Sequence, residues 1–131
     1  MKQLCLFTLL VPLLFTFEQS LDVIDRTAEL LKSGNTRELA VTFSPSIEMS
    51  ILEDEDVYSG TQAEQALSSF FKRCQPRSVR VLHRITSNAN YRIAVVLLGT
   101  SNGNYRTVFS LKNVNGKYEM NELRIESEKT K

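Results

Sequence analysis

The stretch from Tyr58 to Cys74 carries the clearest helical pattern in this chain. Its apolar residues recur at intervals of three and four, while the positions between them are soluble types. On a helix of 3.6 residues per turn, that spacing gathers the apolar side chains on one face. The pattern therefore predicts a helix that packs one face on a sheet through Ala63, Ala66, Leu67, Phe70, Phe71 and Cys74.

The ends of this helix carry their own signals. Two capping boxes overlap at its start, because Ser59 precedes Gln62 by three residues and Thr61 precedes Glu64 by three. Either pair would satisfy backbone N–H groups in the first turn, and the sequence leaves both open. Pro76 ends the helix, since the residue before a proline is pushed out of the α region.

The start of the chain resembles a secretory leader. Residues 3–17 form an apolar run behind the single basic residue Lys2, which is typical of a signal peptide and short for a membrane span of about 20 residues. Ser20 is the best small residue near a cleavage point. We expect a signal peptide at 1–20 and a protein exported to the periplasm or secreted from the cell, with an uncleaved anchor as the alternative.

Length and composition limit what the mature chain can be. Residues 21–127 suffice for a single domain, with 128–131 as a polar tail. Both signs of charge are interspersed around a net charge of +1, which argues against nucleic acid as a partner. We expect no membrane contact after leader removal. With one histidine and one mature cysteine, we expect no metal, no cofactor and no internal disulfide.

The segments around the central helix predict the remaining elements. A helix is expected at 21–33, and a shorter one follows the cap Asn35 and stops at Ser44-Pro45. A strand is expected at 46–52, an acidic turn at 53–56 and a short strand at 57–58. Four further strands, at 78–86, 91–99, 104–112 and 117–126, are separated by polar or Asn-Gly turns.

This order predicts the fold class. Helices gathered on one side of a curved antiparallel sheet make an α+β domain, and the twist of the sheet would leave a cone-like cavity at one end. Residues 91–99 are apolar on both faces, which favours a central strand with a second covered surface.

Several short motifs resemble one family. They are Ser33-Gly34-Asn35 with Glu38-Leu39, Tyr58-Ser59 with Gln62-Ala63-Glu64, Phe70-Phe71, His83, Ser101-Asn102-Gly103 with Arg106, and Leu123-Arg124-Ile125-Glu126. In this order and spacing, the chain resembles the secreted family named domain of unknown function 4783, within the nuclear transport factor 2-like (NTF2-like) superfamily. The resemblance implies a cystatin-like α+β cone and carries no activity with it.

Five residues are candidates for a ligand site. They could face the cavity from the strands or stand at its rim: Glu48, Tyr58, His83, Tyr91 and Arg106. On strict alternation, His83 shares a face with Val79, Val81 and Ile85, where it could act as a general base. The ordinary explanations are a half-buried histidine, and an Arg106 that pairs with a neighbouring strand through Glu119 or Glu122.

Two functions follow as hypotheses. The favoured one is a non-catalytic binding module for a small ligand or an envelope protein, forming a homodimer through the sheet face. The alternative is a small isomerase or dehydratase that uses His83 as its base. A weaker possibility is an interaction surface on an exposed sheet face made by Arg80, Arg84, Arg92 and Arg106.

Overall fold

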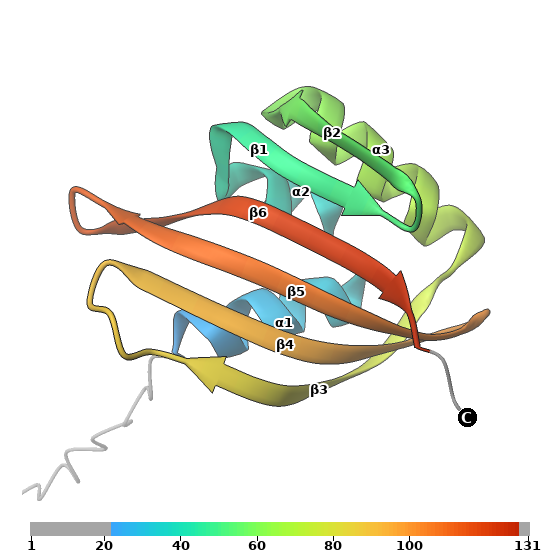
Figure 1. Cartoon of the computed structure of the whole chain (residues 1–131). Coiled ribbons are helices and arrows are strands. Elements are labelled where there is room, and N and C mark those ends of the chain that lie inside the picture. The colour runs from blue at the N-terminus through green and yellow to red at the C-terminus, as the bar shows by residue number, and fades with distance from the viewer. Residues whose placement is uncertain (1–21, 129–131) are drawn as a thin grey trace, which may run out of the picture.

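Six strands form one curved sheet in the computed structural model, which describes residues 22–128 (Figure 1). They are β1 (Phe43–Ile51), β2 (Asp54–Ser59), β3 (Pro76–Ile85), β4 (Tyr91–Thr100), β5 (Gly103–Val114) and β6 (Lys117–Ser127). Their order across the sheet is β2-β1-β6-β5-β4-β3. The expected leader at 1–20 and the end of the expected tail, 129–131, lie outside the described residues.

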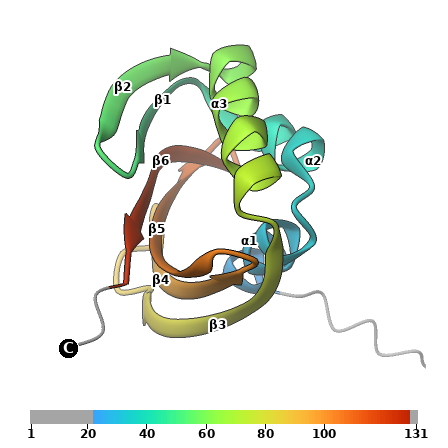
Figure 2. The ribbon, with the colours of Figure 1, turned by 90° about the vertical axis from the view of Figure 1, so that its right-hand side faces the viewer.

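The helices α1 (Val23–Ser33), α2 (Thr36–Val41) and α3 (Gly60–Arg73) lie on one side of the sheet (Figure 2). We call the face turned toward them the concave face and the opposite face the convex face. The expected α+β class is confirmed. One strand pair departs from the expected antiparallel sheet, because β1 runs parallel to β6.

Local chemistry sets the helix ends. Gly34 follows α1 with a φ of 67°, and its N–H reaches the carbonyl of Leu31. The Asn35 side chain then accepts from the N–H of Glu38 and so caps α2. At the start of α3, Ser59 and Gln62 form the capping box in both directions, which decides between the two alternatives left open by the sequence.

The core fills the space between the concave face and the helices. α3 contributes the stripe that its spacing predicted, with Ala63, Leu67, Phe70 and Phe71 all buried. From the sheet come the alternate residues of each strand that face the helices. The fully enclosed sheet residues include Ile47, Met49, Ala94, Val96, Leu98, Phe109, Leu123 and Ile125.

Two segments differ from their predicted structure. Pro45 does not end a helix but lies inside β1, where the pairing with β6 shifts register between Phe43 and Glu48. A proline fits there because an irregular stretch of strand needs no N–H from it. The acidic segment at 53–56 is also no simple turn, since Asp54 already begins β2 and pairs with Ile51.

The first residues of β2, Asp54, Glu55 and Asp56, are exposed on both faces of the strand. The sequence of this segment therefore shows no hydrophobic alternation. β2 is an edge strand, and charged side chains on such an edge discourage pairing with another chain. The backbone N–H of Val57 donates to the side chain of Asp56. This N–H is therefore not available to hydrogen-bond with a strand of another chain.

Candidate functional site

The five predicted site residues lie on five different strands and do not converge. By strand register, Glu48, His83, Tyr91 and Arg106 fall on the convex face. Tyr58, on β2, pairs with the buried Ile47 and packs half-buried against the core on the concave side. The candidate base and its proposed supporting groups therefore do not share a cavity on the concave face.

A bulge in β3 explains the position of His83. Val81 and His83 pair with neighbouring residues of β4, so Leu82 is an extra residue in β3. A bulge of one residue reverses the alternation beyond it. Val79 and Val81 face the core as expected, but the prediction that His83 shares their face is wrong. The side chain of His83 is exposed and shares the opposite face with Ile85.

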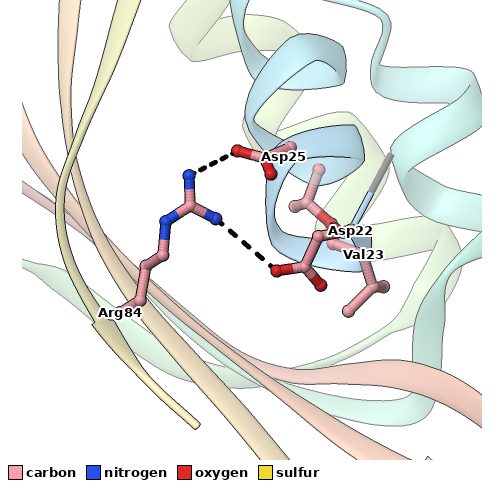
Figure 3. A network of polar contacts seen from close by, with 5 residues as sticks. Asp22, Val23, Asp25 and Arg84 are labelled. Carbon is pink, nitrogen blue, oxygen red and sulfur yellow. Dashed lines mark hydrogen bonds and ion pairs between the residues drawn. The ribbon is translucent and has the colours of Figure 1, made fainter. Parts of the chain in front are cut away.

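The same bulge turns Arg84 toward α1 (Figure 3). The Arg84 side chain there links the edge strand β3 to the start of the helix through polar contacts. One guanidinium nitrogen donates to Asp25 Oδ1 at 2.5 Å, and the other lies 3.5 Å from Asp22 Oδ2. The hydrogen bond to Asp25 is the main reason that the pKa of Arg84 is raised above its usual value. Since all three side chains are partly exposed, each pair contributes about 0.2–1 kcal/mol.

This position corrects the predicted arginine cluster. Arg80 and Arg106 lie on the convex face, because their partners Leu97 and Glu126 do. Arg84 faces the concave side, and so does Arg92, whose guanidinium lies 5.5 Å above the ring of Tyr118. Alternation alone could not separate these residues, because the bulge falls between Arg80 and Arg84.

The middle of the concave side is filled by packed side chains, and the cone-like cavity predicted at one end of the sheet stays a prediction. Leu67 and Phe109 have no accessible surface, and Phe70 has 1%. A side chain without accessible surface borders no space large enough for a water molecule. The hydroxyl of Thr107 is enclosed among these residues, and no described residue offers it a hydrogen bond.

The thiol of Cys74 is buried and held in a polar cluster. Its Sγ lies 3.4 Å from the hydroxyl of Tyr105, and that hydroxyl also donates to the carbonyl of Asn102. The contact with Cys74, followed by burial, raises the pKa of Tyr105. The thiol is therefore occupied in a structural contact, as its place on the apolar face of α3 suggested.

Two hydrogen bonds join the turn between β4 and β5 to the segment after α3. The N–H of Gln75 donates to the Ser101 hydroxyl at 2.9 Å, and the N–H of Ser101 donates to the Gln75 carbonyl at 2.9 Å. Gly103 follows with a φ of 100°, which a side chain would disfavour. These bonds give the motif Ser101-Asn102-Gly103 a structural role.

An open hollow of about 940 Å³ lies beside the turn between β1 and β2. Arg106 is the cation among its lining residues, which are otherwise acidic or polar apart from one leucine: Leu52, Glu53, Asp54, Glu126, Ser127 and Glu128. Arg106 was expected to pair with Glu119 or Glu122, but its neighbour across the sheet is Glu126. Glu122 and Glu126 instead lie 3.6 Å and 4.0 Å from Arg124.

The convex face carries an apolar stripe along its middle. We define this stripe by Ile93, Val95 and Leu97 of β4 and Val108 of β5, all partly exposed. Ile85 of β3 extends it with 49% of its surface accessible. No helix or strand formed by residues 22–128 covers this face (Figure 2).

The described part of the chain lacks the features of two further kinds of site, a membrane-spanning helix and a cluster of metal ligands. None of its helices is long and apolar enough to cross a membrane. Nowhere between residues 22 and 128 do three or more His, Cys, Asp or Glu side chains gather in a way that could hold a metal ion.

Comparison with solved structures shows close likeness in fold. A DUF4783 family protein from Bacteroides uniformis is 23% identical with a TM-score of 0.77, over 83% of this chain and 100% of that one. A second, from Bacteroides fragilis, is 25% identical with a TM-score of 0.72, over 77% of this chain and 94% of that one. A cystatin-like domain of unknown function from Nostoc punctiforme is 12% identical with a TM-score of 0.64, over 82% of this chain and 74% of that one.

Comparison with curated proteins gave no match. The sequence profile of the domain of unknown function DUF4783 matches residues 24–126, which span all nine helices and strands described above apart from the first and last residues. The similarity in sequence agrees with the similarity in fold, and this chain belongs to the DUF4783 family, with an NTF2-like fold.

Proposed function

We propose that this protein is an exported, non-catalytic binding module that acts through the convex face of its sheet. Its partner there is a second copy of the same chain. The observation that carries the proposal is the apolar stripe on the convex face, which the described fold leaves uncovered. Exposed apolar patches of this kind mark interaction surfaces.

The concave side offers less to a ligand. Its middle is packed with enclosed side chains such as Phe70 and Phe109. The small-ligand reading and the isomerase or dehydratase alternative both need a cavity there, and the alternative also needs His83 to face it. Since His83 lies on the convex face, we favour a binding surface over an active site.

The four strands β3 to β6 set an upper limit on the area of a contact through the convex face. Four adjacent strands at about 4.8 Å spacing give a width of roughly 19 Å, and ten residues at about 3.3 Å give a length of roughly 33 Å. The projected area is then on the order of 600 Å², which approaches the roughly 800 Å² of accessible surface that each partner buries in a stable complex.

The export part of the proposal rests on the apolar run at 3–17. Expression of the whole 131-residue chain in a bacterial host, followed by cell fractionation and mass spectrometry, tests it. We expect a periplasmic or secreted product that begins near Leu21. An intact product that stays in the cytoplasm would overturn this part.

Light scattering after size-exclusion chromatography tests self-association on the same purified product. We expect a dimer at micromolar concentration. Val95→Asp, in the middle of the stripe, should give a folded monomer because it buries a charge in the contact. The matched control is Val41→Asp on α2, where the valine is 71% exposed and lies away from the sheet, so dimerisation should persist.

Circular dichroism of both variants confirms that they are folded. A wild-type protein that is monomeric at micromolar concentration would reject the second copy as the partner. Loss of the dimer in both variants to the same extent would reject the convex face as the contact.

A further inference from the structure

Six residues form a grid on the convex face, at the end of the sheet beside the turn between β4 and β5. Its first row, read across β3, β4 and β5, is Arg80, Leu97 and Arg106. Its second row, one step nearer that turn, is Ser78, Gly99 and Asn104. The residues between the two rows face the core, so all six belong to the convex face. The grid thus sets two cations and two neutral polar side chains around the middle strand.

The two arginines of the grid have no carboxylate partner among residues 22–128. Both side chains are exposed, and neither forms an ion pair within that range, whereas Arg84 and Arg124 each contact two carboxylates. Glu126 is the neighbour of Arg106 across the sheet, but its carboxylate lies 4.0 Å from Arg124 instead. The N–H donors of Arg80 and Arg106 are therefore available to a ligand.

The spacing of the strands allows both arginines to reach one ligand. Two strand separations of about 4.8 Å place the backbones of Arg80 and Arg106 about 10 Å apart, with Leu97 between them. Arginine side chains are long enough to meet above the residue that separates them. The planar fork of N–H groups on a guanidinium matches the oxygens of a phosphate or a carboxylate. The first row can therefore hold one anion from two sides.

Gly99 allows the second row to add neutral donors. A Cβ on Gly99 would collide with the hydroxyl of Ser78 and would lie 3.4 Å from Oδ1 of Asn104, so both polar side chains lie over this glycine. A hydroxyl donates one hydrogen bond and an amide nitrogen donates two. The second row lies about 7 Å along the strands from the arginines, within reach of the same bound group.

The number of donors favours a phosphate group over a carboxylate. A phosphate monoester carries a charge of about −1.5 to −2 and three strong acceptor oxygens, so it can use donors from several side chains at once. A carboxylate has a single charge and two oxygens. We infer that the grid binds a phosphate group through the guanidinium groups of Arg80 and Arg106, with Ser78 and Asn104 as neutral donors.

The phosphate belongs to a soluble molecule rather than to a membrane surface. Glu48 and Glu122 pair with each other on the convex face of β1 and β6, and Glu126 lies beside Arg106 on the same face. These carboxylates would face an anionic bilayer laid on the convex face and repel it. A small phosphate ester that reaches only the end of the sheet avoids them.

The inference goes beyond the proposed function, because all four binding side chains belong to one chain and none needs a second copy. The apolar residues Ile85, Ile93, Val95 and Val108 lie farther from the β4–β5 turn than the grid does. A contact centred on them leaves the grid at its rim, where interfaces are polar and open to solvent.

Titration of inorganic phosphate into the purified product of the whole chain, followed by amide NMR spectra, tests the site. We expect saturable shifts at the amides of Gly99 and Asn104 that sodium chloride of the same ionic strength does not cause. Acetate should bind about tenfold more weakly, because it offers fewer oxygens and less charge. Glycerol phosphate and vesicles that contain phosphatidic acid compare a soluble ester with a lipid headgroup, and we expect binding to the ester alone.

Variants assign the binding to the grid. Arg80→Gln and Arg106→Gln should each weaken phosphate binding about tenfold, because each removes charged hydrogen bonds to the anion. Ser78→Ala should weaken it about threefold. Arg37→Gln is the matched control, since it changes the net charge equally but lies exposed on α2, away from the sheet. Its dissociation constant should stay within about twofold of the wild type, and circular dichroism confirms that all variants are folded.

Three results would overturn the site: shifts that do not saturate, shifts that chloride reproduces, and equal losses in Arg80→Gln and Arg37→Gln. Acetate that binds as tightly as phosphate would overturn the ligand class, and vesicle binding that requires Arg80 would overturn the soluble source. Light scattering on the same samples keeps the site separate from the dimer. A monomer that binds phosphate would reject the second copy and keep the site, whereas a dimer that binds none would reject the site alone.

Discussion

The Sγ of Cys74 and the hydroxyl oxygen of Tyr105 lie 3.4 Å apart in the core, although 31 residues separate them in the chain. This contact joins the end of α3 to the beginning of β5. The ring of Tyr105 also meets Phe70 edge-on, with 5.1 Å between the ring centroids. Together these contacts hold the central helix against the sheet.

Tyr105→Phe should lower the free energy of unfolding by about 1 kcal/mol at neutral pH, because it removes the hydroxyl from a buried hydrogen bond and keeps the ring. Urea unfolding measures the change. Tyr91→Phe, on the convex face, is the control and should leave the free energy of unfolding nearly unchanged. Equal losses in both variants would contradict the role of the contact with Cys74.

The same residue predicts a dependence on pH. The folded state raises the pKa of Tyr105 above its ordinary value of 10.0. Its contribution to stability is therefore complete below about pH 10 and is lost as the pH rises through the folded-state pKa. The free energy of unfolding should fall above pH 10, and less steeply in Tyr105→Phe. Parallel pH profiles for the two proteins would contradict this.

Thr107→Val should raise the free energy of unfolding by about 1 kcal/mol. The hydroxyl of Thr107 is buried without a partner among the described residues, and valine has nearly the same shape. Thr27→Val is the matched control, because that buried hydroxyl donates to the carbonyl of Val23 at 2.8 Å and its loss should not stabilise. Urea unfolding that ranks the two variants in the opposite order would count against the prediction.

Arg84→Gln should lower the free energy of unfolding by about 0.5–1 kcal/mol in low salt, because it removes both ion pairs to α1. Most of this loss should disappear in 1 M salt. Arg77→Gln, exposed on the same strand, is the control and should have little effect at either salt concentration. A loss that is independent of salt would point to packing of the arginine stem instead.

Ser59→Ala should lower the free energy of unfolding by about 1 kcal/mol, since Ser59 is the cap of α3. Ser69→Ala lies in the exposed middle of the same helix and should be neutral or slightly stabilising. Thermal unfolding followed by circular dichroism compares the two. If both serines behave alike, the capping box does not stabilise the helix as described.

Local chemistry allowed much of the fold to be predicted from sequence. The stripe on α3, the left-handed Gly34 and the turn at Asn115-Gly116 depend on residues within a few positions of one another. The apolar character of both faces of β4 also indicated that it is not an edge strand, and it lies between β5 and the edge strand β3. These features confirm the fold class and the family resemblance.

Features that depend on distant strands were not predictable in the same way. The bulge at Leu82 exists because β3 must match β4, and nothing in the alternation of β3 itself reveals it. That one residue decides that His83 leaves the core side and that Arg84 enters it. The candidate site failed to converge for this reason, whereas the convex stripe could be anticipated from the apolar outer face of β4.

The position of β6 has a consequence for how the chain acquires its structure. This strand pairs with β5 through a short hairpin and with β1 across most of the sequence, so it alone connects the two halves of the sheet. Until Leu123 and Ile125 have been synthesised, β1 and β2 have no sheet to join. Ordering must then wait for a slow, long-range strand pairing. In a chain with this architecture, the last strand to be synthesised is therefore the one that completes the sheet.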